Sequence, residues 1–192
     1  MGTQTRKERQ RAERHRLIID TAREIAETQG WDAVTVRRLA DAIEYSQPVL
    51  YSHFAGKDAI VAAVAEQGIA ELAIEFARWR AAAESPEQAL TALARGYLDF
   101  ARQRPALYLA MFGLDVDLKF GADAPQALRD AFGELAAVFG PFAGDDDVET
   151  FTEVAWSALH GLATLERDGR LRPGFRDQRL AILVRHWTRG AS

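Results

Sequence analysis

The stretch TVRRLADAIEYSQPVLYSHFAGK, residues 35–57, decides the fold of the N-terminal part of the chain. Apolar residues at positions 36, 39, 40 and 43 have the i, i+3, i+4, i+7 spacing of an amphipathic helix, with Thr35 as its N-cap. After a short break, Ser46 can cap another helix, with Pro48 in its first turn, where a missing N–H costs nothing. Two short helices joined by a turn of three or four residues are the parts of a helix-turn-helix.

Outward from this stretch, almost every segment has helical periodicity. We predict helices over residues 11–29, 57–83, 86–103, 105–113, 124–140, 148–168 and 175–188, with Pro and Gly at the breaks. No segment shows sustained alternation with β-branched residues, so a sheet is not expected. The predicted fold is all-α. It has a three-helix helix-turn-helix domain with a basic N-terminal arm in residues 1–56, and a helical domain in residues 57–192.

Composition limits the class of protein. The 192 residues are 48% apolar, which is enough for a packed interior. The absence of cysteine excludes disulfides and thiolate metal sites and fits a reducing compartment. No run approaches the ~18 apolar residues of a membrane span, and the charged N-terminus does not resemble a signal peptide. We therefore expect a cytoplasmic protein with no membrane partner.

Charge is distributed unevenly along the chain. The net charge of -4 combines +2 for residues 1–57 with -6 for residues 58–192. Within the first sixteen residues, six Lys or Arg stand against two Glu. Such a basic arm would attract phosphates despite the negative total charge. The alternative is a solvated, frayed terminus.

The second helix of the pair is the one that would enter the major groove of DNA. Hydrogen-bonding side chains are frequent on it and just after it: Ser46, Gln47, Tyr51, Ser52 and His53. Glutamine can read adenine through two hydrogen bonds, and the edge formed by Pro48 and Val49 could contact thymine methyl groups. Leu50 and Phe54, four residues apart, would hold the other face against the bundle.

The segments TVRRLADAI (residues 35–43) and SQPVLYSHFAGK (residues 46–57) resemble the DNA-binding domain of the tetracycline-repressor (TetR) family over about residues 12–62. The resemblance implies a homodimeric regulator, with operator DNA and a small-molecule effector as partners. It places base or near-base contacts on Arg37, Gln47, Pro48 and Val49. It places phosphate contacts on Thr35, Tyr51, His53 and Lys57. We add Ser46, which precedes Gln47, to the expected DNA-binding residues. The family usually has glycine in the turn where this chain has Glu44 and Tyr45, so a strained backbone is expected at Glu44.

Lys57 is also a candidate phosphate ligand on physical grounds. It opens a predicted helix directly after Gly56, so we expect its backbone N–H and its ammonium group to face outward at a helix N-terminus. Only three of the 24 basic residues are lysines, so a lysine at this position is less easily explained as a generic surface residue.

The C-terminal part has a weaker resemblance over about residues 86–188. The segment LARGYLDFARQRPALYLAMF (residues 93–112), together with Trp156 and His160-Gly161, looks like a ligand-binding domain named for its Trp-His-Gly (WHG) motif. A mostly apolar pocket is expected from these aromatic and soft residues: Phe76, Trp79, Tyr97, Phe100, Tyr108, Met111, Phe112, Trp156 and His160. His160 could orient a ligand, or could be a satisfied core residue.

Two apolar stripes near the C-terminus predict a dimer interface. They comprise Phe151, Ala155, Ala158, Leu162 and Leu165 on one helix, preceded by Val148, and Leu180, Leu183, Val184 and Trp187 on the last. The alternative is that both stripes face the domain's own core. Reading two DNA half-sites needs two-fold symmetry, which favours the dimer.

Enzyme motifs are missing from the sequence. The four histidines lie far apart with no metal-ligand spacing, and no nucleophile elbow, P-loop or dinucleotide fingerprint occurs. Asp145-Asp146-Asp147 is typical of a capped helix start rather than a calcium loop. We expect no enzyme, cofactor or metal, but a DNA-binding repressor released by a small, largely apolar ligand. The alternatives are an activating or effector-independent regulator, and a helical ligand-sequestering protein.

Overall fold

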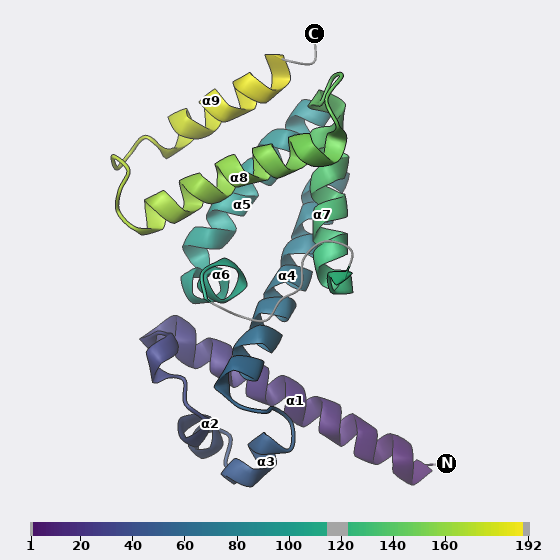
Figure 1. Ribbon diagram of the computed structural model, residues 1–192, viewed down its shortest axis with the longest axis vertical. Helices are drawn as coiled ribbons and strands as arrows, with labels where there is room; N and C mark the ends of the chain where they lie inside the picture. The colour runs from purple at the N-terminus through teal and green to yellow at the C-terminus, as the bar shows by residue number, and fades with distance from the viewer. Residues whose placement is uncertain (1, 115–122, 190–192) are drawn as a thin grey trace. The chain divides into compact units, whose positions relative to one another are not determined.

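The computed structural model describes residues 2–114 and 123–189, and within them the regular secondary structure is helical without strands (Figure 1). This confirms the all-α class. Contacts divide the chain into two compact units, residues 1–68 with 104–119, and residues 69–103 with 120–192. The long helix α4 (Lys57–Ala81) contributes to both units. In the described ranges, no helix combines the length and the apolar character needed to cross a bilayer.

The first unit contains the predicted helix-turn-helix. Its elements are α1 (Gly2–Gln29), η1 (Trp31–Ala33), α2 (Val36–Ala42), α3 (Gln47–Tyr51), the first part of α4, and α6 (Pro105–Phe112). α2 and α3 fall where the sequence predicts them, while α1 begins earlier than the expected start near residue 11. Ile18, Ala22 and Ala26 form its buried stripe.

Two residues from the end of α1 and from η1 attach α6 to this unit. The indole Nε1–H of Trp31 donates a hydrogen bond of 2.8 Å to the carbonyl of Ala106. The Glu27 carboxylate accepts from the backbone N–H groups of Ala106 at 3.1 Å and Leu107 at 3.0 Å. These N–H groups lie in the first turn of α6, where they have no partner within their own helix. Glu27 therefore caps α6 from a distant part of the sequence.

The ends of α2 are fixed by local hydrogen bonds. The Thr35 hydroxyl accepts from the Arg38 N–H at 3.2 Å, which confirms the predicted N-cap. At the other end Glu44 has φ 57°, and the Tyr45 N–H donates to the Ala40 carbonyl at 3.0 Å. This six-to-one bond after a left-handed residue is a Schellman ending, which normally takes glycine. The expected backbone strain at Glu44 is therefore present.

The second unit is a helical bundle. It contains the rest of α4, α5 (Pro86–Gln103), α7 (Gln126–Phe139), η3 (Gly140–Phe142), α8 (Val148–Arg167) and α9 (Arg176–Arg189). In Figure 1, α8 packs across α5 and α7. Leu93, Tyr97 and Leu159 are completely buried between these helices. A Cβ atom at Gly96 would lie 2.5 Å from the Trp79 ring, so α5 needs glycine there.

Polar contacts fix the starts of the last two helices. Asp147 accepts from the Thr150 N–H at 2.9 Å, and these hydrogen bonds lower the pKa of Asp147, which confirms the predicted capped start of α8. Arg176, in the first turn of α9, lies 2.6 Å from Asp99 on α5 and 3.3 Å from Glu166 on α8. Arg176 therefore ties α9 to both neighbouring helices.

Candidate nucleic-acid interface

Helix α3 has the two faces that the sequence predicts. Leu50 is 1% exposed and Phe54, just after the helix, is 7% exposed, and together they hold the segment against the unit's core. Gln47 and Pro48 are exposed at its start, and Tyr51 is 56% exposed. Ser46 is exposed at the N-cap position without a side-chain capping bond, and Val49 is half-buried. The outer face therefore carries polar groups able to contact DNA.

α2 contributes further exposed groups. Thr35 is exposed at its N-terminus, although its hydroxyl already accepts the capping hydrogen bond. The Arg37 side chain is 83% exposed and lies 4.0 Å from Asp41 on the next turn. An exposed pair of this kind holds an arginine only weakly, so its guanidinium can turn toward a phosphate or a base.

Lys57 begins α4 as predicted, but its ammonium group is turned inward. Nζ donates a hydrogen bond of 2.7 Å to the carbonyl of Trp31, and the residue is half-buried. The prediction that this ammonium group faces outward was wrong, because the ammonium donates a hydrogen bond to the Trp31 carbonyl in η1. An ammonium has three N–H bonds, so Lys57 can hold η1 and still donate to a phosphate.

His53 faces α1 rather than standing apart on the recognition helix. Its ring centroid lies 6.2 Å from that of His15, and the His15 ring stacks on Phe54 at 4.4 Å. Burial lowers the pKa of His53, and nearby positive groups on α1, chiefly Arg11, lower it further. His53 is therefore neutral at pH 7, and would contact a phosphate as a hydrogen-bond donor rather than as a cation.

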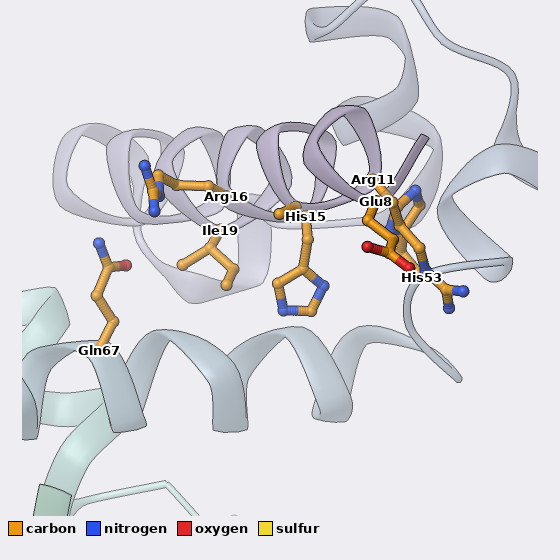
Figure 2. A pocket seen from close by; sticks show the side chains of 8 residues that line it. Glu8, Arg11, His15, Arg16, Ile19, His53 and Gln67 are labelled. Atoms are coloured by element: carbon orange, nitrogen blue, oxygen red, sulfur yellow. The ribbon is translucent and has the colours of Figure 1, made fainter. Parts of the chain in front are cut away.

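Sequence reasoning predicted a basic N-terminal arm, but not that its side chains on α1 lie beside the helix-turn-helix. The Arg14 guanidinium lies 5.9 Å from the ring centroid of Tyr45, in the turn between α2 and α3. Arg11, His15 and His53 line a groove of about 640 Å³, to which α4 contributes Gln67. Figure 2 shows these side chains between α1 and α4. The helical spacing of Arg11, Arg14 and Ile18 was the signal that could have revealed them.

The second unit gathers part of the predicted ligand pocket. Phe76 packs against Trp79 at 5.9 Å and against Tyr97 at 6.3 Å between ring centroids. Trp156 donates from Nε1 to the Tyr97 hydroxyl at 3.1 Å. Phe100 is also buried in this unit, whereas three predicted pocket residues lie on α6 in the first unit: Tyr108, Met111 and Phe112.

His160 joins the same polar chain. Its Nδ1 lies 3.4 Å from the Tyr97 hydroxyl and its Nε2 lies 3.5 Å from the Thr164 hydroxyl. Burial, followed by the charge of Arg167, lowers the pKa of His160. The imidazole is therefore neutral at pH 7 and lies in a half-buried network of hydroxyl and indole groups.

The two apolar stripes of α8 and α9 divide between the core and the surface. Three of the residues predicted for the partner interface are buried in the unit's own core: Ala155, Leu180 and Trp187, the last against Phe139 at 5.2 Å. These three residues are therefore no longer part of the proposed partner surface. The others remain exposed or half-buried: Phe151, Ala158, Leu162, Leu165, Leu183 and Val184. Val154, which is 64% exposed, extends the stripe on α8.

The described residues form a helical protein that contains a helix-turn-helix with an exposed polar face. Two family models match it: the model for bacterial regulatory proteins of the tetR family covers residues 18–64, and the tetracyclin repressor-like C-terminal domain model covers residues 90–186. The chain belongs to the tetR family of bacterial regulatory proteins. It is a DNA-binding transcriptional regulator rather than an enzyme. The WHG subtype of the C-terminal domain stays a prediction.

Individual relatives agree with this assignment. The chain is 27% identical over 156 residues to the uncharacterized HTH-type transcriptional regulator Rv0681 of Mycobacterium tuberculosis, covering 79% of this chain and 69% of that protein. It is 32% identical to the class A tetracycline repressor from transposon 1721 of Escherichia coli, covering 68% of each. A solved structure from Rhodococcus sp. RHA1, of unknown function, superposes with a TM-score of 0.76 at 25% identity, covering 92% of this chain and 94% of that one.

Proposed function

We propose that this regulator is a homodimeric repressor that binds a palindromic operator in the cytoplasm and is released by a small, largely apolar ligand. The exposed polar face of α3, held in place by Leu50 and Phe54, supports this proposal most directly. Two such helices related by a two-fold axis would read two half-sites in successive major grooves.

The DNA contacts divide into base reading and phosphate binding. Gln47→Ala should cost about 1–3 kcal/mol on the operator only, because it removes a base contact. Lys57→Ala should weaken binding to operator and random duplexes alike, and should reduce the salt slope by about one unit, as expected when one phosphate is no longer neutralised. Competition binding at several salt concentrations measures both. If Gln47→Ala keeps full sequence preference, α3 is not the reading helix.

The proposed partner surface is the exposed apolar stripe of α8 together with Leu183 and Val184 of α9. Leu162→Glu should bury an unpaired carboxylate between two copies and produce monomers. Ser157→Glu adds the same charge at an exposed position of α8 and is the matched control. Sedimentation should show a dimer for the control and a monomer for Leu162→Glu. Two intact dimers would place the interface elsewhere.

The proposed ligand site lies among the aromatic residues around Tyr97, Trp156 and His160. An apolar body would pack on the aromatic rings, and the chain of indole, hydroxyl and imidazole would orient one polar group. Because α4 contributes to both units, a ligand that shifts α4 would change the separation of the two recognition helices. A coupling of about 1–3 kcal/mol would lower operator affinity several-fold to about a hundredfold.

A screen of small apolar compounds tests the release mechanism. A true effector should raise the melting temperature by mass action and should also weaken operator binding. Tyr97→Phe keeps the ring and removes the hydroxyl that joins Trp156 to His160, so it should reduce both responses. If no compound changes both melting and DNA binding, an effector-independent regulator replaces this model.

A further inference from the structure

Early in α1, a stretch of helix contributes nothing to the core. The helix runs from Gly2 to Gln29; residues 6–13 are all exposed, and none of residues 6–17 is buried. At 1.5 Å per residue, the stretch of residues 6–17 is roughly 18 Å long. A helix of this length is marginally stable in water without packing partners. The residues of this stretch therefore do not form part of a hydrophobic core.

The charges near the start of α1 also do not stabilise the helix itself. Six basic residues stand against two glutamates between residues 6 and 16. Cations near a helix N-terminus are unfavourable, because the helix dipole places partial positive charge there. A bound polyanion would relieve this repulsion. The charge pattern points to an anionic partner rather than to an intramolecular role.

One stripe of these cations lies on the same face as the buried residues. Lys7, Arg11 and Arg14 precede Ile18 by eleven, seven and four residues, which places all four on one side of an α-helix. Arg6 and Arg9 lie on other sides by the same periodicity. The stripe therefore continues the face that packs against the helix-turn-helix.

Contacts with the helix-turn-helix fix the inner end of this stripe. The Arg14 guanidinium lies over the Tyr45 ring at 5.9 Å, and Arg11 lines the same groove as His53 (Figure 2). Arg11 and Arg14 are also near enough to lower the pKa of His53. The inner end of the stripe therefore lies beside Tyr45 and His53, which stand two positions before and two positions after α3.

We propose that Lys7, Arg11 and Arg14 form a second DNA-contacting surface, the α1 basic stripe, which binds duplex phosphates beyond those reached from α2 and α3. This inference rests on the proposed entry of α3 into the major groove. Each arginine can donate two hydrogen bonds to one phosphate, and contacts of this kind add affinity and fix position without reading sequence. The stripe lengthens the contact made by each half-site.

Two double variants with equal charge test the stripe. Lys7→Gln/Arg11→Gln removes two cations from it, and Arg6→Gln/Arg9→Gln removes two from other sides of the same exposed turns. Binding of the full chain to a random-sequence duplex is measured against salt concentration. The salt slope of the stripe variant should fall by about 0.9 units for each phosphate that it no longer neutralises, and that of the control should fall much less. Arg14→Gln alone should resemble the removal of one cation, with its melting temperature recorded because Arg14 also packs on Tyr45.

The outcomes separate this inference from the proposed function. Equal loss in both double variants would mean that only the overall charge matters, and unchanged slopes in both would mean that α1 does not contact DNA. Either result overturns the stripe, while operator preference that depends on Gln47 would leave the role of α3 intact. Hydroxyl-radical footprints add a geometric readout, because loss of the stripe should unprotect the outer edges of the footprint alone. A wild-type chain that does not bind duplex DNA at low salt would overturn both proposals.

Discussion

Replacing Glu44 by glycine should stabilise the protein. Glu44 has φ 57°, and the turn hydrogen bonds from Glu44 to Asp41 at 3.4 Å and from Tyr45 to Ala40 at 3.0 Å hold it there. A left-handed conformation costs an L-residue about 1–2 kcal/mol. Glycine avoids that cost but loses roughly 0.5–1 kcal/mol more conformational entropy on folding. The difference predicts a gain of about 0.5–1 kcal/mol in the free energy of unfolding.

Thermal unfolding followed by circular dichroism measures this gain. For a chain of this length, the melting temperature should rise by about 1–4 °C. Glu44→Gln is the matched control, because it removes the carboxylate but keeps a side chain in the left-handed position. Both variants lose a negative charge close to the DNA-facing turn, so both should bind duplex DNA more tightly at low salt. If Glu44→Gly is no more stable than Glu44→Gln, the backbone argument is wrong.

Three further substitutions test the contacts that hold each unit together internally. Glu27→Gln should cost roughly 1–2 kcal/mol, because an amide replaces one of the two accepting oxygens at the start of α6, and hydrogen exchange in that turn should accelerate. Gly96→Ala should cost about 1–3 kcal/mol in urea unfolding, and adding Trp79→Phe should recover part of the loss, since the two side chains collide. The lowered pKa of His160 means that the unfolded chain binds its proton more readily, so stability should fall as the pH decreases below about 6.5, the ordinary histidine value, toward the folded pKa. His160→Gln should flatten this fall, and an unchanged pH profile would contradict the assignment.

Local patterns predicted most of the fold because local interactions decide it. Thr35 caps α2 through a bond to a residue three positions away, and the acidic run before α8 caps it in the same way. Leu50 and Phe54 are buried as their spacing indicates. Capping residues and helix periodicity, both visible within a short window of sequence, contain this information.

Contacts between distant residues were not predictable in the same way. No local pattern indicates that Trp31 bonds to Ala106, or that the Lys57 ammonium turns back to the Trp31 carbonyl. The stripe predicted on α8 contains both Ala155 and Leu162, and periodicity alone could not determine that Ala155 faces the core while Leu162 stays partly exposed. These orientations depend on which neighbours pack against a helix.

The attachment of α6 to Glu27 and Trp31 limits how this regulator can be recombined with others. A hybrid made by cutting the gene near codon 57 or 68 would join the helix-turn-helix of this chain to the C-terminal domain of another regulator. Such a hybrid would lack α6 of this chain. The indole N–H and the carboxylate would then lose their partners, and the surface that packs on α6 would be exposed. A functional exchange of modules has to move residues 104–114 together with the first 68, as two separate pieces of coding sequence.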